Sequence, residues 1–222
     1  IQNFKKTFKS ISPLICFSVK SNSNVYLLKE IKKLGLGADV VSKGELLASL
    51  KAGISRNKIV FSGVGKTEEE IEYAIRKNIL LINSESLSEV LKIEEIAKKE
   101  NKLVNIGLRL NPDTDAKTLK QISTGKSENK FGVDKKTFIK IINLMKKSKF
   151  IRIKCLSVHI GSQILNHKPY EKMLGVLDKL LKRLKYKFDI IDLGGGMGIS
   201  YEKNNRKLNY NEYKKSIIKF RR

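Results

Sequence analysis

Short apolar runs alternate with amphipathic stretches along almost the whole chain, and this alternation limits the possible folds more than any other feature. The runs are apolar at consecutive positions, as strands of a sheet covered by helices require. Repeated strand–helix alternation predicts an α/β fold with a parallel sheet. A repeat of roughly 20–25 residues favours a (β/α)8 TIM-type barrel over an open doubly wound sheet. The predicted strands span residues 15–19, 38–41, 58–63, 79–83, 104–110, 153–160 and 188–193, which are seven of the eight strands of such a barrel.

The stretches between these runs carry the signals of helix ends. Gly35 and Gly53 follow apolar positions at helical spacing and are suited to C-caps. Thr67, with Glu70 three residues later, predicts a capping box. The predicted helices lie within residues 24–35, 43–53, 67–78, 84–101, 134–148 and 170–184.

One stretch does not fit the repeat. Residues 111–134 form a long polar insertion after the fifth predicted strand. In a barrel this position lies on the C-terminal face, where active sites are found. We therefore expect one barrel domain over residues 1–222, with this insertion beside its site.

The net charge of +24 raises the question of nucleic-acid binding. The basic residues are mostly lysines spread over predicted helix faces, and the chain has no Trp. Nucleic-acid sites favour arginine and stacking aromatic residues. We therefore expect no nucleic-acid partner, although retention on DNA at physiological salt would contradict this.

The remaining composition argues against a membrane protein or a metal site. No run of about 18 apolar residues is present, and the N-terminus has no signal-peptide pattern. Cys16 and Cys155 lie far apart in apolar runs, which indicates buried thiols in a reducing, cytoplasmic compartment. Only His159 and His167 are available as imidazole ligands, so we expect no metal. The chain does not begin with Met, and we expect it to be part of a longer protein.

Lys20 stands where the first predicted strand leaves the core, in the segment ICFSVKSNSN. A lysine is costly to bury without a partner. It either only marks the end of the strand or is placed to react.

Two glycine-containing segments resemble phosphate-binding loops. The segment FSGVGKT ends like a P-loop, but Val60 stands where the motif needs Gly, so we interpret it as a turn before a capped helix. Gly194, Gly195 and Gly196 directly follow the seventh predicted strand, and Ile199 excludes the GxGxxG pattern. Their backbone N–H groups could close around an anion, as loops after late barrel strands often do. The alternative for these glycines is a flexible linker.

Four more polar residues lie at strand ends. His159 ends the sixth strand and is either a core histidine or part of a site. Arg109 ends the fifth strand and needs an anionic partner. Asp39 and Glu45 lie near the end of the second strand, where ordinary solvation or helix N-terminal charge would also explain them. Together with Lys20 and the glycines, these residues suit pyridoxal phosphate, because an amine can form a Schiff base with its aldehyde.

Six segments resemble the diaminopimelate decarboxylases, which belong to the alanine-racemase-like group of pyridoxal-phosphate enzymes. They are FSVKSNSN, GADVVSKGELLASLKAG, KIVFSGVGKTEEEI, LRLNPDTDAKTLKQISTGKSENKFG, SVHIGSQI and DLGGGMGI, and they cover the chain from about residue 13 to residue 201. The resemblance implies decarboxylation of meso-diaminopimelate to L-lysine and CO2, with pyridoxal 5'-phosphate as cofactor. A related basic amino-acid or polyamine-precursor decarboxylase, or a non-catalytic cofactor-binding barrel, stays open as an alternative.

The resemblance also implies roles for single residues. Lys20 would be the Schiff-base lysine and His159 would stack on the pyridine ring, and these two are the predicted catalytic residues. Ser162 would hold the cofactor phosphate together with Gly194, Gly195 and Gly196. Asp39, Glu45 and Arg109 would surround Lys20 and the cofactor.

The chain departs from the family pattern in two ways. Phe17, Ser18 and Ser21 replace Tyr, Ala and Ala around Lys20, which are small changes. The family continues with a Glu-Pro-Gly-Arg segment on strand eight and a C-terminal β-domain used across a homodimer interface, and neither is in residues 1–222. We therefore expect an incomplete barrel that is inactive and poorly stable alone.

Overall fold

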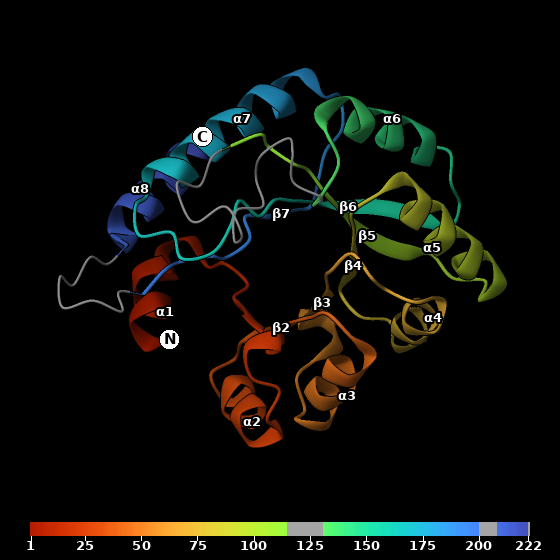
Figure 1. Cartoon of the computed structure of the whole chain (residues 1–222), viewed down its shortest axis with the longest axis horizontal. Coiled ribbons are helices and arrows are strands. Elements are labelled where there is room, and N and C mark those ends of the chain that lie inside the picture. The colour runs from red at the N-terminus through yellow and green to blue at the C-terminus, as the bar shows by residue number, and fades with distance from the viewer. Residues whose placement is uncertain (115–130, 200–207, 222) are drawn as a thin grey trace.

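The computed structural model describes residues 1–114, 131–199 and 208–221. Seven parallel strands form one sheet in the order β1-β2-β3-β4-β5-β6-β7, and the sheet curls with helices outside it (Figure 1). The strands are β1 (Cys16–Ser18), β2 (Gly37–Val40), β3 (Ile59–Phe61), β4 (Leu81–Ser84), β5 (Val104–Arg109), β6 (Ile151–Ser157) and β7 (Ile190–Asp192). All seven predicted strands are confirmed, and so is the barrel class; β1, β3 and β7 are shorter than predicted.

Eight helices lie in the described part of the chain. They are α1 (Gln2–Phe8), α2 (Val25–Lys33), α3 (Lys43–Lys51), α4 (Glu68–Lys77), α5 (Leu87–Lys99), α6 (Lys135–Met145), α7 (Lys168–Arg183) and α8 (Tyr210–Phe220), with 3-10 turns η1 (Lys9–Ile11), η2 (Val19–Ser21) and η3 (Arg56–Lys58). The six predicted helices are confirmed, as is the capping box of Thr67 and Glu70 at the start of α4. Gly35 and Gly53 follow α2 and α3 with φ angles of 75° and 83°, which is the left-handed conformation of a C-cap. None of these described helices is long and apolar enough to cross a membrane.

Helices α1 and α8 were not predicted, and they pack against each other at the two ends of the chain (Figure 1). The rings of Phe8 and Tyr213 lie 5.9 Å apart between centroids, and those of Phe4 and Tyr210 lie 5.3 Å apart. Among the described residues, β1 and β7 are the two edges of the sheet and do not pair with each other. The aromatic contacts between α1 and α8 therefore connect the first and last elements where the sheet itself does not.

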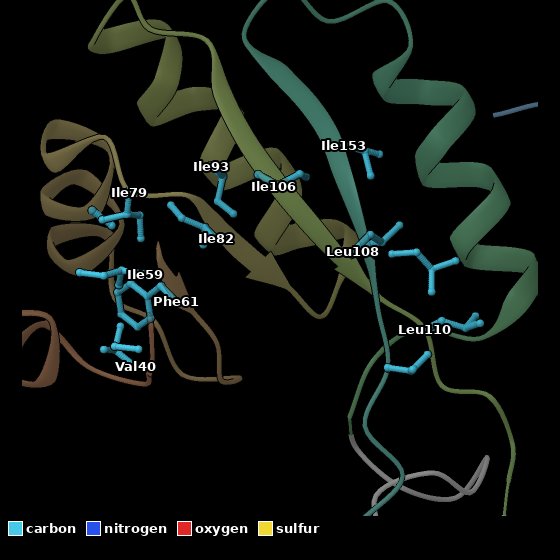
Figure 2. Close-up of a cluster of buried hydrophobic side chains, with 14 of the residues drawn as sticks. Val40, Ile59, Phe61, Ile79, Ile82, Ile93, Ile106, Leu108, Leu110 and Ile153 are labelled. Carbon is cyan, nitrogen blue, oxygen red and sulfur yellow. The ribbon is translucent and has the colours of Figure 1, made fainter. Parts of the chain in front are cut away.

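The core consists of branched aliphatic and aromatic side chains that point from the strands toward the helices and toward one another. Figure 2 shows this cluster around β2 to β6. At most 1% of the surface is exposed at Val40, Phe61, Ile82, Ile106 and Leu108. Burial on this scale explains why the strands were readable as continuous apolar runs.

The insertion after β5 leaves and returns at adjacent positions on the C-terminal face. Leu110 and Val133 form a parallel bridge. The Val133 N–H donates to the Arg109 carbonyl, and the Asn111 N–H donates to the Val133 carbonyl. The predicted position of the insertion is confirmed at its two ends, while residues 115–130 lie outside the described part.

Lys66, in the segment that resembles a P-loop, is a buried structural residue. Its side chain is 1% exposed and its ammonium lies 2.6 Å from Glu89 Oε1. The same ammonium donates to the carbonyls of Gly63 and Asn83 at 2.6 and 2.7 Å. All three donors of the amine therefore have protein acceptors, and the interpretation of this segment as a turn before a capped helix is confirmed.

We predict that Lys66→Met lowers the free energy of unfolding by about 3 kcal/mol, because it leaves the Glu89 carboxylate, 14% exposed, without its cation. Urea unfolding followed by circular dichroism measures the change. The control is Lys92→Met, since Lys92 pairs with Glu68 and Glu95 at the surface and its loss should change stability little. Equal effects of the two substitutions would contradict the buried role of Lys66.

Candidate active site

Lys20 lies directly after β1, in the 3-10 turn Val19–Ser21, at the C-terminal end of the sheet. Its side chain is exposed. Its positive charge acts on two other predicted site residues: it is one of the causes that lower the pKa of Asp39 and of His159. The structure therefore brings Lys20, Asp39 and His159 within electrostatic reach of one another.

Asp39 is the inward-facing acid of β2. Ser62 Oγ donates to its Oδ1 at 2.6 Å. The pKa of Asp39 is raised to about 6, with burial as the largest cause. The Ser62 hydrogen bond and the Lys20 charge lower the pKa, and the charge of Asp192 raises it. A carboxyl with this pKa can gain or lose a proton near neutral pH.

A hydrogen-bond network, which the sequence did not reveal, runs from Asp39 through Ser62 and Asn83 to Asp192. The amide of Asn83 on β4 donates to Ser62 Oγ at 3.2 Å and to Asp192 Oδ2 at 3.3 Å. Ser157 on β6 donates to the same Asp192 oxygen at 2.9 Å. The polar residues that end otherwise apolar runs, Asn83 and Asp192, were the only sequence signal for this network.

His159 follows β6 and accepts a hydrogen bond at Nδ1 from the Gly195 N–H at 3.3 Å. Burial, with smaller contributions from the nearby charges of Arg109 and Lys20, lowers its pKa to about 4. The ring is therefore neutral at pH 7. Of the two alternatives for His159, the geometry favours the site over a plain core position, because its ring touches the glycine turn.

The glycine turn, residues Gly194 to Gly196, is held closely against the loop after β6. Gly194 and Gly196 have φ angles of 66° and 85°. A Cβ atom on Gly194 would lie 2.5 Å from the Val158 carbonyl oxygen, and one on Gly196 would lie 1.8 Å from that of Gly161. The alternative of a flexible linker is therefore wrong, because two of the three glycines are required by contacts and backbone conformation.

The predicted anion nest is only partly available for a ligand. The Gly194 N–H donates to Asp192 Oδ1 at 2.9 Å, and the Gly195 N–H donates to His159. A Cβ atom on Gly195 would meet no atom within 4 Å, so open space lies beside the middle of the turn. Ser162, exposed and next to Gly161, lies on the loop that faces the turn.

The anionic partner that Arg109 needs is Glu85, which the sequence did not single out. The guanidinium Nη1 donates to both Glu85 carboxylate oxygens, at 3.0 and 3.1 Å, and Nη2 donates to the His159 carbonyl at 3.4 Å. The two side chains are 11% and 3% exposed. Arg109 thus fixes the backbone that carries His159, and a direct contact with a cofactor stays a prediction.

Glu45 lies near this group without joining it. Its Oε2 accepts the Val41 N–H at 2.9 Å, in the first turn of α3. Its charge contributes to the raised pKa of Asp39. The local interpretation of Glu45, a helix N-terminal acid, therefore agrees with the geometry, and its place in the shell around Lys20 stays a prediction.

A cavity of about 510 Å³ lies at the other end of the sheet. It is bordered by Leu81 and Val104, the first residues of β4 and β5. Parallel barrels place their chemistry at the C-terminal strand ends. The size of this cavity is therefore no guide to the active site, and among the described residues no cluster of three or more His, Cys, Asp or Glu suits a metal ion.

Comparison with known proteins identifies the family. The family described as "Pyridoxal-dependent decarboxylase, pyridoxal binding domain" matches residues 1–222. The chain belongs to this family. Its cofactor is pyridoxal phosphate.

Several relatives of this pyridoxal-binding domain are named diaminopimelate decarboxylase. The diaminopimelate decarboxylase of Helicobacter pylori (strain J99 / ATCC 700824) is 43% identical over 219 residues, which are 97% of this chain and 54% of that protein. The diaminopimelate decarboxylase of Aquifex aeolicus (strain VF5) is 43% identical over 202 residues, 90% of this chain and 48% of that protein. The crystal structure of the H. pylori enzyme complexed with L-lysine superposes with a TM-score of 0.94 at 41% identity, over 99% of this chain and 56% of that one. The chain spans about half the length of these relatives.

The residues of the pyridoxal-binding domain fit this cofactor. Lys20 presents an exposed amine, and His159 presents a flat ring that is neutral at pH 7. Open space beside Gly195 leaves room at the glycine turn. A nucleophile, a flat neutral ring and a glycine turn with open space are what binding of an aldehyde, a pyridine ring and a phosphate requires.

We predict that His159→Asn reduces the loss of stability in acid. The pKa of His159 is lower in the folded chain than its ordinary 6.5, so its contribution to the free energy of unfolding is complete above pH 6.5 and falls as the pH drops toward about 4. The contribution is on the order of 3 kcal/mol. Urea unfolding at pH 4 to 7 measures it.

The control for this prediction is Asp39→Asn. The pKa of Asp39 is raised in the folded chain. Its contribution to the free energy of unfolding is therefore present below pH 3.8 and is lost as the pH rises through about 6. Its removal should make the acid loss steeper, which is the opposite of the His159 effect. A His159→Asn variant with the wild-type pH dependence would contradict the buried, neutral ring.

The glycine turn predicts opposite results for two alanine substitutions. Gly196→Ala should lower the free energy of unfolding by about 2 kcal/mol or more, because of the positive φ and the Gly161 carbonyl. Gly195→Ala should leave stability almost unchanged and weaken cofactor binding, because its methyl group enters the open space. Thermal unfolding and cofactor titration measure both; full cofactor affinity in Gly195→Ala would contradict the placement of the site.

Proposed function

We propose that this chain is the cofactor-binding barrel of a diaminopimelate decarboxylase, which converts meso-diaminopimelate to L-lysine and CO2. The observation that carries the proposal is the exposed Lys20 amine within reach of the Asp39 carboxylate and the neutral His159 ring. The curated relatives that share this barrel at 43% identity are named for the same reaction.

Each residue at the site has a proposed part in holding the cofactor. Lys20 would hold the cofactor through its aldehyde. The His159 ring would offer a flat surface to the pyridine ring, and its neutrality would avoid placing a positive charge there. Ser162 and the glycine turn would hold the phosphate.

Pyridoxal phosphate supplies an electron sink for the pair of electrons left when CO2 departs. The chain's own residues supply the proton chemistry and the orientation. Ser62 fixes one oxygen of Asp39, which leaves the other free to hold or release a proton beside the Lys20 amine. Because the pKa of Asp39 is about 6, it can change protonation state as Lys20 binds and releases its partners.

The substrate separates this proposal from its alternatives. A decarboxylase for another basic amino acid or polyamine precursor would use the same barrel residues. The full-length protein should release CO2 from meso-diaminopimelate in preference to lysine, ornithine and arginine. A non-catalytic barrel would bind the cofactor and release CO2 from none of them.

We also propose a homodimer in the cytoplasm. The family resemblance supports the dimer, because the predicted C-terminal β-domain acts across an interface. The two cysteines, Cys16 and Cys155, are unpaired, which suits a reducing compartment. Sedimentation of the full-length protein tests the dimer.

We predict that borohydride reduction with pyridoxal phosphate labels the peptide that contains Lys20, and that Lys20→Ala abolishes both the label and CO2 release. Mass spectrometry of the digested protein locates the label. Lys29→Ala, an exposed lysine on the following helix, serves as the control and should keep both. A label on another lysine in the wild-type protein would overturn the proposed site.

A further inference from the structure

We propose that Tyr170 is a positioning residue: its hydroxyl fixes the Gly195 carbonyl and thereby directs the Gly196 N–H toward the cofactor phosphate. The inference rests on the proposed phosphate site at the glycine turn. It adds a residue that the sequence indicated only as part of a helix.

The contact that carries this inference joins α7 to the turn. The Tyr170 hydroxyl donates to the Gly195 carbonyl oxygen at 3.0 Å. Tyr170 lies in the first turn of α7 and is fully buried. Its ring packs on that of Tyr213, with centroids 4.4 Å apart, so neighbouring side chains hold the hydroxyl in place. The carbonyl of Gly195 is therefore directed into the core.

The direction of the next N–H follows from the planarity of the peptide group. The carbonyl and the N–H of one trans peptide unit point in opposite directions. No cis peptide bond occurs among the residues that the structure describes. Because Tyr170 holds the Gly195 carbonyl toward the core, the Gly196 N–H points away from the core.

The other two N–H groups of the turn are already used. Gly194 donates to Asp192, and Gly195 donates to His159. Within the described ranges, the hydrogen bonds include none that is donated by the Gly196 N–H. A backbone N–H that donates to none of the described residues needs an acceptor, and a phosphate oxygen is a suitable one. Of the three predicted donors in the glycine turn, Gly196 is thus the one left for the ligand.

Two cofactor forms test this role on the full-length protein. Pyridoxal phosphate carries the phosphate, and pyridoxal lacks it. We expect Tyr170→Phe to lower the ratio of the two affinities about fivefold, because the Gly195 peptide can then rotate and weaken one phosphate hydrogen bond. Absorbance titration of each form gives the ratio.

Tyr186→Phe is the matched control. The Tyr186 hydroxyl donates to the Ile153 carbonyl at 2.9 Å, so the substitution removes the same kind of bond away from the turn. It should leave the affinity ratio unchanged. An unchanged ratio in Tyr170→Phe would overturn the proposal, because a purely structural tyrosine would affect both cofactor forms alike.

A second measurement needs no substitution. Amide NMR of the wild-type protein should show the Gly196 resonance shifting more than those of Gly194 and Gly195 when pyridoxal phosphate replaces pyridoxal. A larger shift at Gly194 or Gly195 would overturn the assignment of the donor. Failure of the wild-type protein to prefer pyridoxal phosphate at all would instead contradict the proposed phosphate site.

Discussion

The carboxylate of Asp192 ties the interior of the barrel to the turn that follows it. One oxygen accepts the Gly194 N–H, and the other accepts Ser157 and Asn83. A carboxylate at the end of an apolar strand is tolerated only when its oxygens are hydrogen-bonded, and here both are. The position of the glycine turn relative to β4, β6 and β7 therefore depends on this one group, and the His159 contact depends on the turn.

The network also depends on two glycines, Gly107 and Gly196, at positions where no side chain would fit. A Cβ atom on Gly107 would lie 1.9 Å from Asn83 Oδ1, so any larger residue on β5 would displace the amide that reaches Asp192. Gly196 has the same importance for the turn, because the Gly161 carbonyl occupies the space that a side chain at residue 196 would need. Hydrogen bonds and close backbone contacts thus require each other: the polar groups fix the loops, and the glycines let the loops come close enough.

The parts of the structure that repeat were predictable from the sequence, and the parts that depend on register were not. Apolar runs and caps predicted the strands and six helices, and strand ends predicted where Lys20, His159 and the glycines would gather. The bond between Asn83 and Asp192 joins residues 109 positions apart, so no local pattern reveals it. Glu85 was missed for the same reason, because its pairing with Arg109 exists only once β4 and β5 are aligned. Helix α1 has only seven residues, and its ring contacts with α8 join the two ends of the chain, so a search of either segment alone does not detect them.

The charges around His159 decide which residue of the site can handle protons. Burial, Arg109 and Lys20 all disfavour a second proton on the ring, and Nδ1 is already an acceptor for the Gly195 N–H. Protonation at Nδ1 would convert this acceptor into a donor and break the bond that holds the turn. The imidazole is therefore kept neutral, and a neutral ring is a surface that can pack against another aromatic ring. Asp39 is under the opposite influence, since burial and Asp192 favour its protonated form while Lys20 favours the charged one. We accordingly propose that Asp39 handles protons at this end of the barrel and that His159 contributes shape and orientation.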